Sequence, residues 1–237
     1  MSGFATTRRS GVIRFVRPDS RWLVTGLNGG HHRADAAYNM TVPEGWERHD
    51  LLAYRDERLA AVGFEATGPA LFTGVDMTHA RGARLASVTV VATVGLSNPA
   101  ALPPSPEDRP HQSTDPTDEG GTVGTVNLLV GTTRALTEGT LATLLSVVTE
   151  AKAATLLRRV GFPGTTTDAV VVGCDPSGES ATFAGSATAV GDAARACVRD
   201  AVEASLAARY ADDSPPASVE DATHGVSTDR RATVFDP

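Results

Sequence analysis

Lysine is almost absent from this chain of 237 residues, because 20 of its 21 basic residues are arginine and only Lys152 is lysine. Aromatic residues make up 5% of the chain, and only two cysteines are present, Cys174 and Cys197. Two isolated cysteines exclude a disulfide scaffold and a cysteine-based zinc site. We therefore expect two reduced, buried thiols, and the single lysine becomes the residue whose position needs an explanation.

Long apolar runs are also missing. No uninterrupted apolar stretch reaches the roughly 18 to 20 residues that span a bilayer, and the start, MSGFATTRRSGVIRFVRP, lacks the apolar core of a signal peptide. A hydrophobic content of 41% and a charged content of 21% are those of an ordinary soluble globular protein. We therefore expect a cytoplasmic protein with no membrane span.

Negative charge is concentrated in two segments. Residues 99–121 carry five acidic residues against Arg109, and residues 211–237 carry six against two arginines, so each segment has a net charge of −4. With −7 for the whole chain, the rest is nearly neutral, which argues against an extended basic surface for nucleic acid. The two acidic segments are rich in Pro, Asp, Ser and Gly. This composition predicts that 99–121 is a flexible insert within a domain spanning residues 1–210, and that 211–237 is a disordered tail.

The order of expected elements indicates an α/β layered fold of the mixed α+β kind. Helices are expected at about 48–61, 137–160 and 188–210, with Thr137 as the start and Gly161 as the stop of the second. β-branched, apolar runs predict strands. The sheet is expected to be mixed or largely antiparallel and covered by the long helices. The expected strands are 12–16, 22–26, 70–75, 86–95, 125–131, 169–174 and 181–185.

The lone lysine falls inside the apolar stripe of the second long helix. With Leu141 set at 0° and about 100° per residue, Lys152 lies at about 20° and Glu150 at about 180°. A buried ammonium is costly unless it is paired, so such a lysine is a candidate for a catalytic or anion-binding group. A lysine that reaches solvent past the stripe, or one in a structural ion pair, is the alternative.

Two further polar clusters are unusual for purely structural segments. GLNGGHH, residues 26–32, follows a strand and lets a backbone approach a ligand closely, although a simple hairpin explains it as well. GFPGTTTDAVVVG, residues 161–173, places three threonines and an aspartate before a strand, which suits ligand binding or acid–base chemistry, or a capped turn. Adjacent His31 and His32 have no third ligand at a recognisable spacing, so no metal site is expected.

Taken together, these clusters resemble the adenosylcobinamide amidohydrolase (CbiZ) family over roughly residues 12–210. The resemblance is carried by LNGGHHRADAAYNMTVP, TGVDM, VTVVATVGLSN, GTVNLLVGTTRALTEGTLATLLSVVTEAKAATLLRRVG, GTTTDAVVVGC and ATFAGSATAVGDAARACVRDAVEASL. The most specific part is the series GTVN, TEAK, GTTTDA and the AGSATAVG junction. The insert after Asn98 and the acidic tail depart from the family pattern, and Ser186 stands where threonine is frequent.

The resemblance implies a corrinoid-salvage enzyme that hydrolyses the aminopropanol amide of adenosylcobinamide. It would form adenosylcobyric acid and 1-amino-2-propanol for coenzyme B12 synthesis, with no cofactor in the protein because the corrinoid brings its own cobalt. A corrinoid-binding protein without catalysis, and a hydrolase of another amide, are the alternatives; the sequence leaves a homo-oligomer open. The residues implied are, for catalysis, Lys152, Glu150, Asp168, Thr166 and Thr167, and, for substrate binding, Asn28, Gly29, Gly30, Asn39, Asn98, Asn127 and Thr165.

Overall fold

The computed structural model describes residues 3–43, 50–64, 68–102, 124–222, 224–228 and 230–237. Within these residues the helices are α1 (Leu51–Ala61), α2 (Glu138–Val160) and α3 (Ala189–Arg209), with a 3₁₀ turn at Met77–His79. The strands are β1 (Ala5–Arg9), β2 (Val12–Val24), β3 (Gly30–Thr41), β4 (Ala70–Thr73), β5 (Arg81–Leu85), β6 (Val88–Val94), β7 (Pro99–Ala101), β8 (Val126–Thr132), β9 (Gly164–Thr165), β10 (Ala169–Cys174) and β11 (Val226–Ser227).

The main sheet is mixed, as the sequence predicts. Its strand order is β4-β3-β2-β10-β8-β6-β5, with β1 paired to β2 beside this path. The pairs β10–β8 and β3–β4 are parallel, and the other pairs are antiparallel. The two strands at the centre, β8 and β10, begin at the same end of the sheet, so the segments that precede them lie together there.

β2 is the strand at which the sheet bends. Its first part, Val12–Val16, pairs with β1, and its last part, Arg21–Val24, pairs with β10 on the same edge. Between them the register with β3 shifts, and Asp19 has a left-handed φ of 57°. Such an irregularity bends and twists a strand, so β1, β3 and β4 form one leaf and β10, β8, β6 and β5 form another.

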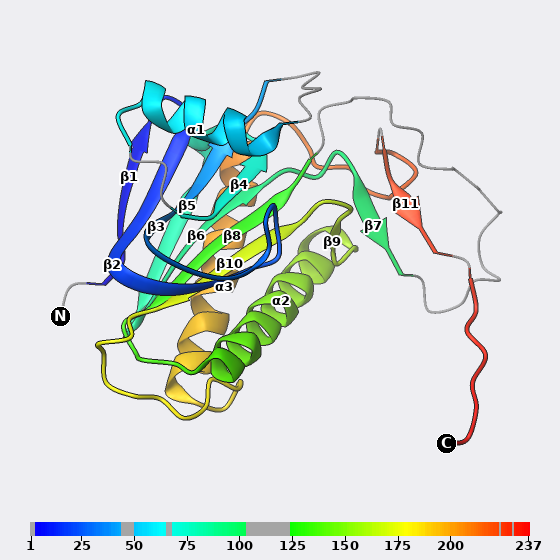
Figure 1. The fold of residues 1–237 in the computed structure, drawn as a ribbon. Helices are drawn as coiled ribbons and strands as arrows, with labels where there is room; N and C mark the ends of the chain where they lie inside the picture. Colours follow the sequence, from blue (N-terminus) through cyan, green and yellow to red (C-terminus); the bar gives the residue numbers. More distant parts are fainter. Residues whose placement is uncertain (1–2, 44–49, 65–67, 103–123, 223, 229) are drawn as a thin grey trace.

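Three apolar cores fill the spaces between the layers. One lies between the second leaf and helices α2 and α3, one between the two leaves, and one between the first leaf and α1. The middle core joins residues of both leaves, including Phe15 and Trp22 of β2 and Leu129 of β8. Figure 1 shows the resulting order of layers, with α1 on one side of the strands and α2 and α3 on the other.

The helices agree with the predicted ones to within three residues, because their caps are encoded locally. The Thr137 side chain accepts from the Thr140 N–H at the start of α2, and Gly161 ends α2 with a left-handed φ of 82°. The strands agree less well. The expected strands 12–16 and 22–26 are two parts of β2, and 181–185 is not a strand. β3 and β5 were not expected because exposed polar residues interrupt their apolar pattern.

By length and average hydropathy alone, α2 meets the criterion for a membrane-spanning helix, although it carries charged residues. It packs against α3 and β10, and core helices of this kind pass the same test. One helix of this composition is weak evidence for a membrane span, so the expectation that the chain has none stays a prediction.

Both cysteines are unpaired and buried, and burial raises the pKa of the Cys174 and Cys197 thiols.

A second, small sheet lies at the start of β8 and β10 and has the order β11-β7-β9. It was not expected, because its strands are only two or three residues long and come from three distant parts of the chain. β7 lies in the first residues of the predicted flexible insert, 99–121; residues 103–121 of that insert lie outside the described residues. β11 lies in the predicted disordered tail, whose disorder stays a prediction.

Candidate active site

Lys152 lies on the buried face of α2, where the helical periodicity places it. Only 6% of its surface is exposed, and Leu141, Leu144 and Val148 on the same stripe are completely buried. Its Nζ donates a hydrogen bond to Oδ2 of Asp168 and forms an ion pair with it. The only lysine of the chain is therefore held out of bulk solvent beside a carboxylate that immediately precedes β10.

The Asp168 carboxylate accepts hydrogen bonds from four donors. Oδ1 accepts from the Val126 N–H (2.9 Å) and from the Thr165 hydroxyl, and Oδ2 accepts from the Thr165 N–H (3.2 Å) and from Lys152. Two backbone amides, a hydroxyl and an ammonium thus surround both oxygens. The arrangement fixes Asp168 and aims Lys152, and it leaves little room for Asp168 to bind a further donor.

Gly164 of β9 lies directly against this ion pair. A Cβ atom added at Gly164 would lie 2.3 Å from Asp168 Oδ2 and 2.7 Å from Lys152 Nζ. Both distances are far below normal contact, so any side chain at this position would push the pair apart. The pair therefore requires glycine here, and its geometry depends on where the β9 backbone lies.

Threonine hydroxyls form the solvent-facing side of the cluster. Thr165 is 8% exposed, whereas Thr166 and Thr167 are exposed. The Thr167 hydroxyl donates to the Gly124 carbonyl (3.1 Å) and lies 3.1 Å from the Thr125 hydroxyl. The three threonines expected from GTTTDA therefore lie in one loop with Asp168; Thr165 binds Asp168 directly, and Thr166 and Thr167 are the exposed residues of the loop.

Asn98 contributes a buried amide to the same cluster. Its Nδ2 donates to the Thr166 hydroxyl and, at 3.4 Å, contacts that of Thr167. Asn98 is only 1% exposed, and its Oδ1 has no hydrogen-bond partner among the described residues. Because a buried polar atom is normally paired, this oxygen is a candidate acceptor for a ligand N–H.

Asn39 and Asn127, also expected at the site, lie between the two leaves of the sheet. Asn127 Nδ2 donates to Asn39 Oδ1 (3.0 Å) and to the Phe72 carbonyl (2.8 Å), and Asn39 Nδ2 donates to the Thr93 hydroxyl (3.0 Å). Both are at most 1% exposed. Their amides hold β3, β6 and β8 together rather than facing solvent, although Asn127 Oδ1 has no described partner.

The glycine-rich stretch is the hairpin between β2 and β3, which was the structural alternative considered. Asn28 has a φ of 52° and Gly30 of 106°, values that the tight connection requires. Its base meets the start of β10, since Gly26 packs against Ala169. The tip lines a cavity of about 240 Å³, whose lining residues include Asn28, His32 and Arg55.

A cavity larger than that of the hairpin, about 410 Å³, lies elsewhere. It is lined by residues of β1, β5 and β6, including Arg8, Arg81 and Arg84, and by no member of the Lys152–Asp168 cluster. Size alone would place the site there. The Lys152–Asp168 ion pair, the threonine hydroxyls and the Asn98 amide oxygen, which has no partner among the described residues, favour the cluster, because these groups supply the charge and hydrogen bonds that catalysis uses.

Glu150 is the one expected catalytic residue that lies apart. It is exposed on the opposite face of α2 from Lys152, as its place on the helical wheel indicates. No group of three or more His, Cys, Asp or Glu residues that would hold a metal occurs within the described part of the chain. Thr125 and Gly164 were not predicted; the motifs GTVN and GTTTDA contain them, but only their spatial contacts single them out.

The sequence resemblance is matched by comparison with known proteins. A family model described as adenosylcobinamide amidohydrolase matches residues 2–214. An adenosylcobinamide amidohydrolase of Halobacterium salinarum is 53% identical over 236 residues, which cover 99% of this chain and 100% of that protein. One of Methanosarcina mazei is 27% identical over 204 residues, covering 82% of this chain and 94% of that protein.

Similarity to solved structures is weaker. A protein from Pyrococcus horikoshii OT3 superposes with a TM-score of 0.43 at 12% identity, covering 87% of this chain and 80% of that one. A beta-aminopeptidase from Burkholderia sp. gives a TM-score of 0.40 at 15% identity, covering 87% and 83%. Superpositions this distant carry no functional argument.

Proposed function

The chain belongs to the adenosylcobinamide amidohydrolase family, and we propose that its Lys152–Asp168 cluster is where it hydrolyses the corrinoid amide. The enzyme is a corrinoid-salvage amidohydrolase. It cleaves the amide that joins the corrin ring to aminopropanol in adenosylcobinamide. The products, adenosylcobyric acid and 1-amino-2-propanol, return to coenzyme B12 synthesis.

Amide hydrolysis sets three requirements: an activated nucleophile, stabilisation of the oxyanion, and protonation of the leaving amine. Lys152 suits the second and third. Its ammonium has three N–H donors, and the described contacts use one of them, on Asp168. The other two are available to an oxyanion, and a charge shielded from water interacts more strongly with it.

Asp168 acts in this proposal by positioning. Its four hydrogen bonds hold the Lys152 ammonium and the Thr165 hydroxyl at one place. The Thr167 hydroxyl, which contacts Thr125 and Gly124, orients the attacking water. As the water adds to the amide carbon, Lys152 gives a proton to the aminopropanol nitrogen, the C–N bond breaks, and Lys152 takes up the proton that the water releases.

Substrate amides are recognised by amides of the protein. Asn98 Oδ1 accepts an N–H from a corrin side chain, because it is buried and unpaired beside the exposed threonines. The hairpin at Asn28, Gly29 and Gly30 lies at the same end of the sheet and supplies backbone close to the macrocycle. We propose no protein-bound cofactor, since cobalt belongs to the substrate, and we place the enzyme in the cytoplasm.

The observation that carries this proposal is the ion pair of the only lysine, shielded from solvent, whose partner Asp168 also binds the threonine loop through Thr165. Incubation with adenosylcobinamide and mass spectrometry of released aminopropanol tests the reaction. We expect Lys152→Met to lower turnover at least about tenfold, since it removes the charge that stabilises the oxyanion. The matched control is Arg158→Met, which removes a positive charge from the exposed face of the same helix.

Arg158→Met is expected to keep wild-type turnover. Full turnover in a folded Lys152→Met protein would remove Lys152 from the mechanism. Binding of the corrinoid without released aminopropanol in the wild type would favour a carrier protein. Faster cleavage of simple amides than of adenosylcobinamide would favour a different amide substrate.

A further inference from the structure

The end of the chain beyond residue 214 lies outside the region that the family model matches, yet it reaches the candidate active site. We propose that residues 218–222 and 224–227, here called the C-terminal latch, hold strand β9 in the position that turnover requires. This inference rests on the proposed function of the Lys152–Asp168 cluster. The latch is a positioning element and contributes no catalytic group.

The latch is connected to the site through the small sheet. β11 pairs in parallel with β7, with Val226 opposite Ala100 and Ser227 opposite Ala101. β7 in turn pairs with β9, with Ala100 opposite Gly164 and Pro99 opposite Thr165. Strands this short have little stability as an isolated pair, so the third strand contributes to keeping β9 in place.

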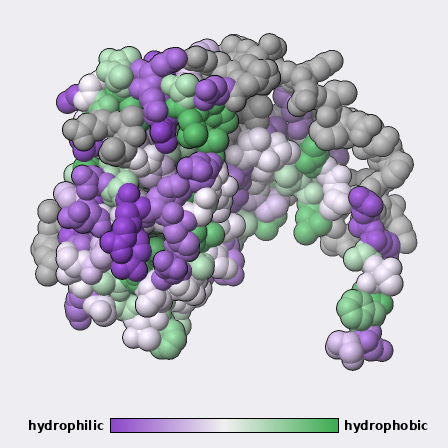
Figure 2. Space-filling model, in the orientation of Figure 1, coloured by the Kyte–Doolittle hydropathy of each residue, from purple (hydrophilic) through white to green (hydrophobic). Residues whose placement is uncertain are grey.

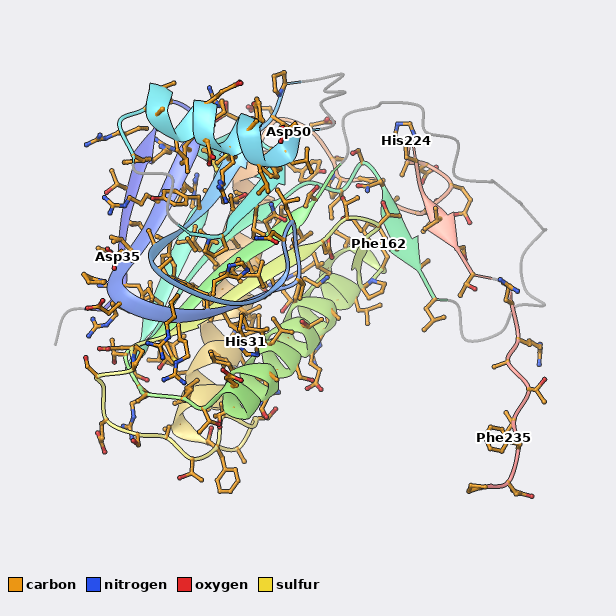
Figure 3. The ribbon with its side chains drawn as sticks, in the orientation of Figure 1. His31, Asp35, Asp50, Phe162, His224 and Phe235 are labelled. Atoms are coloured by element: carbon orange, nitrogen blue, oxygen red, sulfur yellow. The ribbon has the colours of Figure 1, made fainter. Side chains whose placement is uncertain are left out.

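A second connection runs through the two residues before β7. The His224 N–H donates to the Ser97 carbonyl (3.2 Å), and the Thr166 N–H donates to the carbonyl of the next residue, Asn98 (3.1 Å). Figure 3 shows His224 on the side of the molecule where β7 and β11 lie. The carbonyl of Ser97 therefore binds the latch, and the carbonyl of Asn98 binds the loop of Thr166. Because Ser97 and Asn98 are consecutive, a shift of the latch moves that loop.

The site is sensitive to such a shift because β9 lies against the ion pair. The Gly164 backbone leaves no space for even a methyl group beside Lys152 Nζ and Asp168 Oδ2. The Thr165 N–H and hydroxyl bind Asp168 directly. A displacement of about 1 Å in a reacting group can cost about 100-fold in rate. A β9 strand that is held less firmly would displace Lys152 and Asp168 and so lower turnover.

The latch is an ordered turn with its own hydrogen bonds. The Ser218 hydroxyl and Asp221 bind each other, at 3.1 Å between side chains and 3.3 Å to the Asp221 N–H. Val219 is only 8% exposed. A Cβ at Gly225 would lie 2.1 Å from the Val219 carbonyl oxygen, so the turn closes tightly.

The residues after the latch are different and provide a control. Val234 is 93% exposed and Phe235 is 79% exposed. Figure 2 shows this end of the chain projecting away from the body. A substitution there changes the same terminal region without touching the small sheet.

Two latch variants of the full-length chain test the inference. Gly225→Val opens the turn by steric conflict with Val219, and Val226→Pro removes an N–H from β11 and restricts its backbone. We expect kcat for aminopropanol release to fall at least about tenfold in both, with KM changed less than about threefold, because the reacting groups move while most of the substrate contacts stay. Phe235→Ser is expected to match the wild type.

Hydrogen exchange separates this inference from the proposed reaction. In both latch variants, the amides of Thr165 and Thr166 are expected to exchange at least about tenfold faster, with an unchanged thermal midpoint for the main unfolding transition. Unchanged exchange at residues 164–167 together with wild-type kcat would overturn the latch. Faster exchange in a protein whose wild type releases no aminopropanol would leave the latch standing and refute the reaction. If one variant fails to fold, the other decides.

Discussion

The two ends of strand β10 each carry an aspartate in an ion pair, Asp168 partly buried and Asp175 buried, and the two pairs differ in their surroundings. Asp168, just before the strand, holds Lys152. Asp175, just after it, holds Arg17, whose Nε and Nη2 both bind Oδ2. At Asp175 the remaining oxygen accepts from the Ser177 N–H (2.9 Å) and hydroxyl (2.7 Å) within the same turn.

The difference lies in the cation and its surroundings. Two guanidinium nitrogens of Arg17 bind one carboxylate oxygen of Asp175, and the turn of Ser177 binds the other, so the Arg17–Asp175 pair has a structural role. Lys152 carries a point charge, its contacts with the described residues use one of its three donors, and its partner Asp168 also binds the Thr165 hydroxyl. The same ion-pair chemistry therefore serves stability at one end of β10 and, in our proposal, catalysis at the other.

Matched substitutions at the two aspartates give the largest expected contrast. We expect Asp168→Asn to lower turnover at least about tenfold, because Lys152 loses its fixed partner. We expect Asp175→Asn to keep near-wild-type turnover and to lose about 3 kcal/mol in the free energy of unfolding, since breaking a buried pair leaves Arg17 uncompensated. Aminopropanol release and urea unfolding measure the two effects. Equal loss of turnover in both variants would refute the division of roles.

Acid titration sharpens the structural side of the contrast. Burial raises the pKa of Asp175, but hydrogen bonds from Ser177 and Arg17 outweigh it and hold that pKa below the ordinary value of 3.8. The unfolded chain therefore takes up a proton first, and the stabilisation from Asp175 is present above about pH 3.8 and is lost as the pH falls towards the lower folded-state pKa. The difference in unfolding free energy between wild type and Asp175→Asn should shrink over this range.

Asp76 provides an internal reference for that titration. The Thr78 N–H lowers the pKa of Asp76, which titrates in the same acidic range in both proteins and cancels in their difference. A difference that stays constant from pH 5 to pH 3 would contradict the assignment to Asp175.

The smallest expected effect is at Glu150. Glu150 is exposed on the far face of α2, so Glu150→Gln is expected to change turnover by less than about twofold and stability by less than about 0.5 kcal/mol. Steady-state kinetics of aminopropanol release measures this. A tenfold loss would mean that Glu150 reaches the substrate, and would return it to the mechanism as the sequence first suggested.

Local sequence patterns predicted the helices and the site motifs of this molecule better than they predicted its strands. Helical periodicity placed Lys152 inward and Glu150 outward, because one helix face is set by residues three and four apart. The GTTTDA motif placed its threonines near Asp168 because these residues are neighbours in the sequence. The strands 12–16 and 22–26 were predicted separately because a bulge in one long strand resembles a turn in sequence.

The sequence by itself determined the three helices, most of the central strands and the burial of its only lysine, since caps and periodicity act over a few residues. Only the tertiary structure decided that Asp168 meets Lys152, and that Asn39 and Asn127 join the two leaves of the sheet. It also decided that the terminal strand β11 lies on β7 beside the site. Each of these contacts joins segments far apart in the chain, and their pairing follows from packing of the whole fold rather than from any local pattern.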